Sequence, residues 1–173
     1  MGYKDRNTLD KVGQYSLENL EIISYRQDKE ESAPKIIDIS AITLNFEIKE
    51  DILTNTMVGS IIVLDSQDIR TILPITGMEK LSFKYATPGF DGYDCTEKTG
   101  NPMQIYKVDG VRLEEKAGKQ QYYQIFFTSE ELYNNAITRV SQAFAGPTED
   151  AVDKILRSRL YLNSKKPLFF EGS

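Results

Sequence analysis

Residues 35–49 read KIIDISAITLNFEIK, and the spacing of their apolar side chains indicates the fold. Apolar residues first fall on odd positions, from Ile37 to Ala41, and then on even positions, from Ile42 to Ile48. A period of two is typical of a β-strand with one buried face. Because a shift of one residue turns that face outward, the change of phase predicts a bulge or bend near Ala41 and Ile42. Bulges let sheets curl, so the stretch favours a strongly curved antiparallel sheet or a β-barrel.

Strand patterns also occur on both sides of this stretch. Apolar side chains predict further strands at residues 17–25, 59–64, 78–85, 104–115 and 119–127. Asp65 and Ser66 can cap a short helical turn at residues 67–73. Residues 87–102 are rich in glycine, proline and aspartate and predict a long loop, and Lys116–Gly118 predicts the turn of a hairpin.

The pattern changes after the last of these strands. Thr128–Glu131 has the spacing of a capping box, in which Thr128 caps a helix and Glu131 reaches back. Apolar residues at helical spacing predict that this helix runs to Gly146, with a second helix at Thr148–Leu160. A shared seam against the sheet is expected from Val140, Phe144, Val152 and Leu156. The expected fold class is therefore α+β, a sheet or barrel followed by a helix pair.

Three regions are expected along the chain. Residues 1–16 predict a flexible lead-in, residues 17–128 a β-barrel-like domain, and residues 129–173 a helical segment with the start of a further region. The ending Lys166–Ser173 is apolar and strand-like, and we interpret it as an interruption. A longer protein is therefore expected.

The composition excludes most catalytic chemistry. The 173 residues contain no histidine, and Cys95 is the only cysteine. The chain therefore lacks the commonest general base and metal ligand, and it can form neither an internal disulfide nor a thiolate zinc cluster. Ser60 and Ser141 have neither a nucleophile elbow nor a base. We expect no enzyme activity, no catalytic residue, no cofactor and no metal site.

The charges and the apolar runs argue against two classes of partner. The net charge is −5 and the basic residues are scattered, whereas nucleic-acid binding needs clustered lysine and arginine. The one basic cluster is Arg157, Arg159, Lys165 and Lys166, which we interpret as complementing a helix dipole. No apolar run approaches the roughly 18 residues of a membrane span, so no direct membrane insertion is expected.

Pairs of acidic residues offer weaker alternatives. Asp65 with Asp68, and Asp91 with Asp94, could hold calcium, but turn formation and capping explain aspartates at these positions better. The adjacent glutamates at 30–31, 114–115 and 130–131 could be imagined as a glycosidase acid and base. That reaction requires two carboxylates that face each other across a sugar, which adjacent residues do not supply.

Two segments resemble the tail hub proteins of contractile-tailed bacteriophages. Leu73–Phe83, LPITGMEKLSF, follows a glycine-containing strand, Asp65-Ser66 and a helical turn, and it resembles the entry to the next strand in that family. Arg139–Gly146, RVSQAFAG, follows a strand and Ser129-Glu130, and it resembles a segment of related virion proteins. The matching segments lie in the expected order within residues 36–160.

The resemblance implies a structural role in the virion, after synthesis in the cytoplasm of the host bacterium. The family forms a homotrimer whose β-barrel domains join into a ring at the end of the tail tube, and the ring carries the spike. The partners it implies are copies of the chain and other tail proteins, such as spike and tube. It implies no catalytic residue.

A second hypothesis is a carbohydrate- or ligand-binding β-domain of a phage receptor-binding or accessory protein. Ten tyrosines are present, and aromatic rings can stack on sugars. The loop at residues 87–102 is the expected contact surface, with Phe90 and Tyr93 as its aromatic side chains.

Overall fold

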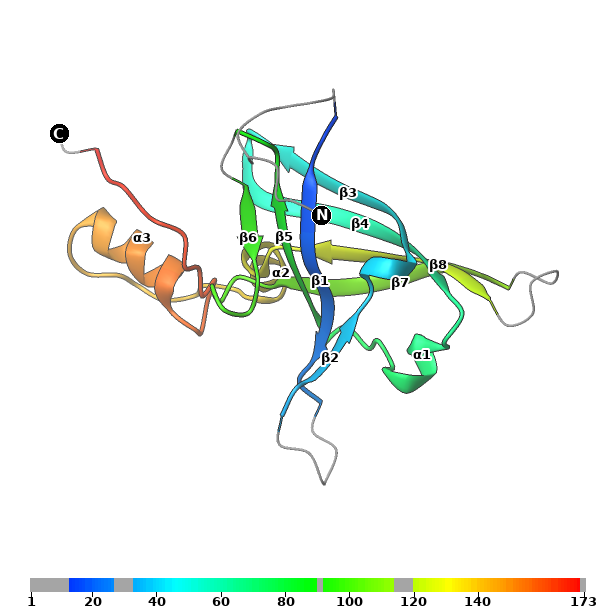
Figure 1. Ribbon diagram of the computed structural model, residues 1–173. Coiled ribbons are helices and arrows are strands. Elements are labelled where there is room, and N and C mark those ends of the chain that lie inside the picture. The colour runs from blue at the N-terminus through cyan, green and yellow to red at the C-terminus, as the bar shows by residue number, and fades with distance from the viewer. Residues whose placement is uncertain (1–12, 27–32, 90–91, 114–119, 172–173) are drawn as a thin grey trace.

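A computed structural model describes residues 13–26, 33–89, 92–113 and 120–171 (Figure 1). The strands are β1 (Ser16–Ser24), β2 (Lys35–Asp38), β3 (Thr43–Asp51), β4 (Thr54–Asp65), β5 (Lys80–Ala86), β6 (Tyr93–Cys95), β7 (Met103–Leu113) and β8 (Gln121–Thr128). The helices are the 3-10 turn η1 (Ser40–Ile42), α1 (Ile69–Ile72), α2 (Glu130–Ile137) and α3 (Thr148–Arg157). The predicted α+β class, with an antiparallel sheet, is confirmed.

All of the described strands belong to one open sheet. Their order is β2-β1-β5-β7-β8-β4-β3, every pair is antiparallel, and β6 adds beside β5. In the described residues the end strands β2 and β3 do not pair, so the sheet is not closed, and the β-barrel, one of the two forms expected for residues 17–128, is wrong. The sheet is weakest between β5 and β7, which share only the pairs Lys80–Gln104 and Leu81–Met103. β6 pairs along the rest of that side of β5.

The bulge or bend predicted near Ala41 and Ile42 is a break between two strands, formed by the 3-10 turn η1. β2 ends at Asp38, whose Oδ1 accepts the N–H of Ser40 at 2.8 Å and starts η1. β3 then begins at Thr43 at the opposite end of the strand order. The buried Ile39 sits between them, and its N–H donates to Leu20 O at 3.0 Å. The change of phase therefore separates two strands that never pair.

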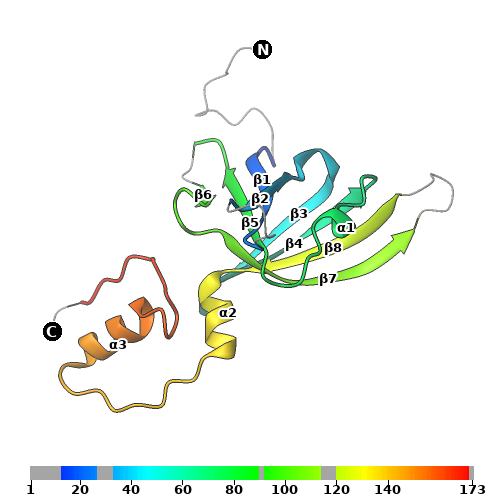
Figure 2. The same ribbon diagram turned by 90° about the horizontal axis from the view of Figure 1, so that it is seen from below.

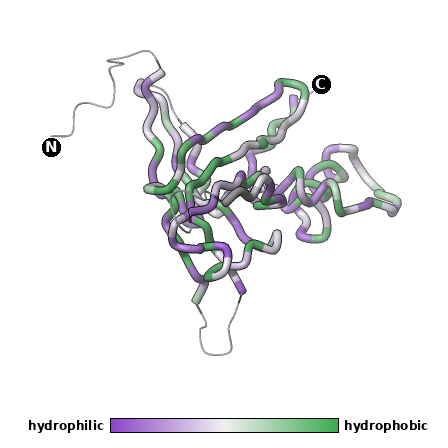
Figure 3. Tube along the Cα trace, turned by 90° about the vertical axis from the view of Figure 1, so that its right-hand side faces the viewer, coloured by the Kyte–Doolittle hydropathy of each residue, from purple (hydrophilic) through white to green (hydrophobic). Residues whose placement is uncertain are grey.

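The core lies on the face where rings from distant strands meet. Phe46 of β3 lies 5.9 Å from Phe127 of β8 and 5.1 Å from Phe83 of β5, measured between ring centroids. β3 and β5 are separated by three strands, so both ends of this run contribute to one core. Figure 3 shows hydrophobic and hydrophilic residues interspersed along the chain.

The two helices after the sheet differ from the prediction. α2 ends at Ile137, where the backbone becomes extended at Thr138 (φ of −105°, ψ of 138°), and residues 138–147 are not helical. The capping box does not form: the Thr128 hydroxyl donates to Met57 O at 3.1 Å, as part of β8. Ser129 precedes the helix instead, without a side-chain capping bond.

The expected helix seam is also wrong. Neither α2 nor α3 contains a buried residue, and Val140 and Val152 are exposed. Figure 2 shows α3 standing off from the sheet, beyond α2. Among the described residues no helix is long and apolar enough to cross a membrane.

The remaining elements follow the sequence closely. The predicted strands correspond to β1, β4, β5, β7 and β8, and the predicted helical turn contains α1. The expected loop at residues 87–102 contains the short strand β6. The hairpin turn Lys116–Gly118 and most of the lead-in lie outside the described residues.

Candidate functional site

A cleft of about 1000 Å³ lies beside one end of the sheet. Four segments that are distant in sequence line it: the β3–β4 turn, the stretch from β6 to β7, the start of α2, and residues 163–166 after α3. Acidic side chains come from Glu50, Asp94 and Glu131, and basic ones from Lys165 and Lys166. The cleft therefore has charges of both signs around its rim.

Tyr93 connects two walls of the cleft. Its hydroxyl donates to Glu50 Oε2 at 2.6 Å, so β6 is tied to the end of β3. This hydrogen bond to a carboxylate, together with desolvation, raises the pKa of Tyr93 to about 12. The phenol is therefore protonated at neutral pH and serves as a donor, not as a base.

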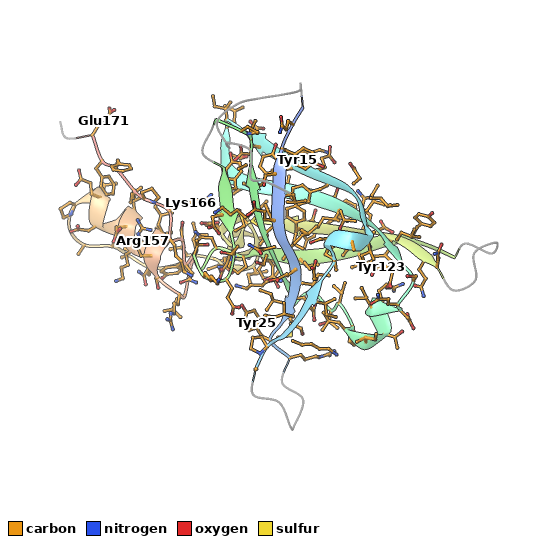
Figure 4. The ribbon with its side chains drawn as sticks, in the orientation of Figure 1. Tyr15, Tyr25, Tyr123, Arg157, Lys166 and Glu171 are labelled. Carbon is orange, nitrogen blue, oxygen red and sulfur yellow. The ribbon has the colours of Figure 1, made fainter. Side chains whose placement is uncertain are left out.

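Polar contacts fasten the segment after α3 to α2. Asn163 Nδ2 donates to Glu130 Oε1 at 3.3 Å, and Ser164 Oγ donates to Glu131 Oε1 at 2.8 Å. Lys166, which Figure 4 labels, places its Nζ 4.0 Å from Glu131 Oε2. Glu130 and Glu131, one of the adjacent pairs considered for a glycosidase, thus both bind neighbouring side chains. Sequence reasoning missed these asparagine and serine contacts.

The single cysteine lies in the cleft wall. Cys95 is buried, and burial, followed by the nearby Asp94 carboxylate, raises the pKa of its thiol to about 11. A thiol of this kind stays protonated at neutral pH and is a poor nucleophile.

The first aspartate pair serves the backbone. Asp65 is fully buried, and its carboxylate accepts the N–H groups of Gln67 at 2.9 Å and Ile69 at 2.8 Å, and the Tyr123 hydroxyl at 3.1 Å. Asp68 occupies the left-handed region with φ of 56° and contacts Gln121 instead. The pair therefore forms a turn, as the sequence favoured, and its carboxylates do not converge on one point.

The second aspartate pair is only partly described. Asp94 accepts the N–H and hydroxyl of Thr96, and these bonds lower the pKa of its carboxyl group. Asp91 and Phe90 lie outside the described residues, as do the glutamates at 30–31 and 114–115. Within the described ranges, no group of three or more potential metal ligands occurs.

One buried carboxylate was not anticipated from the sequence. Glu79 is fully buried, and its Oε2 accepts the N–H groups of Thr76, Gly77 and Met78 at 2.7, 3.0 and 3.2 Å. Three successive amides around one carboxylate lock the loop before β5. This arrangement is structural, because its acceptor oxygens are already occupied by the chain's own donors.

The two serines considered from the sequence lie in different surroundings, and the Ser60 hydroxyl donates to Glu47 Oε2 at 3.5 Å. Ser60 is buried in β4 and accepts a hydrogen bond from Gln124 Nε2 at 2.9 Å, and Ser141 is exposed in the stretch between α2 and α3. Comparison of the chain with protein-family models, curated proteins and solved structures gives no match.

Proposed function

We propose that the chain is a structural protein of a virion, a hub component of the tail or baseplate of a contractile-tailed bacteriophage. In this role it forms a homotrimeric ring that joins the tail tube to the spike, and it has no catalytic task. The sequence resemblance supports this proposal. The structural observation that carries it is the free edge of β3, which pairs only with β4 among the described strands.

A free edge of this length favours assembly. β3 spans nine residues, and its outer side offers backbone N–H and C=O groups to a further strand. In a symmetric ring, a neighbouring copy or another tail protein covers such edges. The aromatic side chain of Phe46 in β3 contacts Phe83 and Tyr85 in β5. These contacts support a strongly curved sheet, which is the shape that the wall of a trimeric assembly requires.

Sedimentation velocity of the chain over a range of concentrations tests this function. The proposal predicts that the sedimentation coefficient rises with concentration to that of a trimer. A purely monomeric species at high micromolar concentration contradicts the proposal.

The cleft favours ligand binding as a second candidate function. Its volume lies at the upper end of the range of ligand pockets, about 300–1,000 Å³, and Tyr93 on its wall can stack on a sugar. Glycan-array binding that disappears with Tyr93→Ala, but survives Tyr106→Ala at an exposed tyrosine of β7, supports this function. No binding to any glycan on the array rejects it for carbohydrates. Phe90→Ala extends the test to the other aromatic side chain of the loop.

A further inference from the structure

The turn between β3 and β4 presents two apolar side chains to solvent. Ile52 is fully exposed, and Leu53 is 88% exposed. Asp51 fixes the turn, because its Oδ1 accepts the Leu53 N–H at 2.9 Å. Two-residue hairpin turns usually carry glycine, asparagine or aspartate, so the turn itself does not require an isoleucine–leucine pair. Glu50–Leu53 is called the tip below.

Another exposed apolar side chain, Leu160, lies among basic residues. Residues 154–166, called the basic arm below, contain five basic residues and no acidic one. Ser158 forms a turn in the arm: its carbonyl accepts the Tyr161 N–H at 3.0 Å, and its hydroxyl accepts the Leu160 N–H at 3.2 Å. Leu160 is 79% exposed, and the adjacent Arg159 is also exposed.

Within one copy the tip lines the cleft together with residues 163–166 at the base of the arm, but the exposed turn at residues 158–161 is not part of that lining. Figure 1 shows the β3–β4 turn at one end of the sheet and the C-terminal end of α3 well away from it. The hydrogen bonds of Asn163 and Ser164 to α2 fasten the base of the arm. The apolar side chains of the tip and of Leu160 are therefore uncovered within a single chain.

We propose that the tip of one copy docks on the basic arm of a second copy. Ile52 and Leu53 would pack against Leu160, while the acids of the tip face Arg159 and its basic neighbours. Burial of apolar side chains drives such a contact, and opposite charges at its rim select the partner and the orientation. This inference rests on the proposed self-assembly and names the surfaces that carry it.

The charges of the tip argue for a protein partner over a lipid surface. Exposed apolar residues at a hairpin end can also insert into a membrane, but Glu50 and Asp51 directly precede them. Anionic lipids attract basic segments and repel acidic ones. A surface that is both apolar and basic is the complement of the tip, and the basic arm provides it within the same sequence.

Two different surfaces make this contact, which determines the kind of assembly. A contact between unlike patches is head-to-tail, and it produces a closed ring or an open filament. The tip spans four residues, far fewer than the roughly 20–30 residues per side of a standard interface, so a single contact is weak. Closure of a ring strengthens it, because each copy then makes two contacts at once.

Cross-linking between two separately tagged variants tests the contact. One variant carries Thr54→Cys beside the tip, the other carries Tyr161→Cys beside Leu160, and both carry Cys95→Ser. Neither introduced cysteine replaces one of the contacting side chains Ile52, Leu53 and Leu160. We expect a short bis-maleimide to join the two variants to each other far more than it joins either to itself. A matched control, Met78→Cys at an exposed side chain before β5, replaces the tip variant and should give little product.

Charge reversal supplies the second readout. Arg159→Glu in the arm variant should weaken the association about tenfold. Glu50→Arg in the tip variant should restore it, because the charges are opposite again. Tyr93→Phe controls for the hydrogen bond that Glu50 loses.

The outcomes separate this inference from the proposed function. Wild-type self-association in sedimentation, with no preferential cross-link between tip and arm, overturns the inference alone. A monomeric wild type overturns both. Pelleting of the wild type with phosphatidylcholine–phosphatidylglycerol vesicles, abolished by Leu53→Asn, assigns the tip to lipid and also overturns the inference.

Discussion

Gly59→Ala tests the packing that gives the sheet its inner face. Gly59 lies in β4, where it pairs with Ile48 of β3 on one side and Phe127 of β8 on the other. A Cβ added at this glycine would lie 2.3 Å from Cζ of Phe127 and 2.4 Å from the carbonyl oxygen of Glu47. The ring of Phe127 rests on the backbone here, so only glycine fits without movement.

The cost follows from these two contacts. Real Cβ atoms essentially never lie closer than 3.0 Å to another heavy atom, so the ring and the backbone of β3 must both retreat. Phe127 is fully buried and stacks on Phe46, so it cannot move without disturbing that contact. Overpacking a core costs about 1–3 kcal/mol, and we expect the upper end, about 3 kcal/mol. For a chain of this size the melting temperature then falls by about 6–12 °C.

Thermal unfolding followed by circular dichroism measures this effect. Gly110→Ala is the control, because Gly110 also needs a special conformation, φ of 67°, but an added Cβ meets no atom within 4 Å. It should cost only about 1–2 kcal/mol from backbone strain. Adding Phe127→Leu to Gly59→Ala should cost less than the sum of the two single changes. A Gly59→Ala melting temperature equal to that of the wild type would refute the packing of Phe127 over β4.

Three further predictions concern the cleft and the arm. The pKa values of Tyr25 and Tyr93 are raised to about 12 in the folded state. Because these phenols therefore lose their protons at lower pH in the unfolded state, the free energy of unfolding should fall as the pH rises from about 10 to about 12. Urea unfolding at several alkaline pH values checks this, and Tyr93→Phe should make the decline shallower. Maleimide should label Cys95 slowly at neutral pH in the folded protein and rapidly in urea, because burial protects a protonated thiol; equal rates would contradict the burial. Ser164→Ala removes the hydrogen bond to the Glu131 carboxylate and should lower the local free energy of opening by about 1.5 kcal/mol. The expected result is faster amide exchange at residues 158–166. Ser141→Ala, at an exposed position, should leave that exchange unchanged.

Period-two alternation located most strands but did not determine their neighbours. Residues 35–49 show the same change of phase whether a strand bulges or breaks, and the break at η1 sends β2 and β3 to opposite ends of the sheet. Pairing partners are long-range facts that no local pattern contains. The end of the first helix at Ile137 was also not predicted, because the apolar spacing continues to Phe144 whereas the backbone becomes extended at Thr138.

The cleft could not be predicted, because its walls come from segments that only the tertiary fold brings together. The loop at residues 87–102 was nevertheless identified, and Tyr93 does line the cleft. The exposed tip could have been predicted, because Ile52 and Leu53 interrupt a polar, acidic stretch at the position of a turn. The buried Glu79 had no such signal, since an acidic residue after Gly77-Met78 resembles any surface position.

Amide hydrogen exchange at low and high protein concentration tests most directly whether copies of this chain associate through β3 and the tip. At low concentration the outward-facing amides of β3 should exchange fast, because β4 binds only the other side of the strand. The account predicts that these amides and those of the Ile52-Leu53 turn slow markedly as the concentration rises, while buried strands such as β8 stay unchanged. Exchange at β3 and at the turn that is identical at every concentration would contradict it.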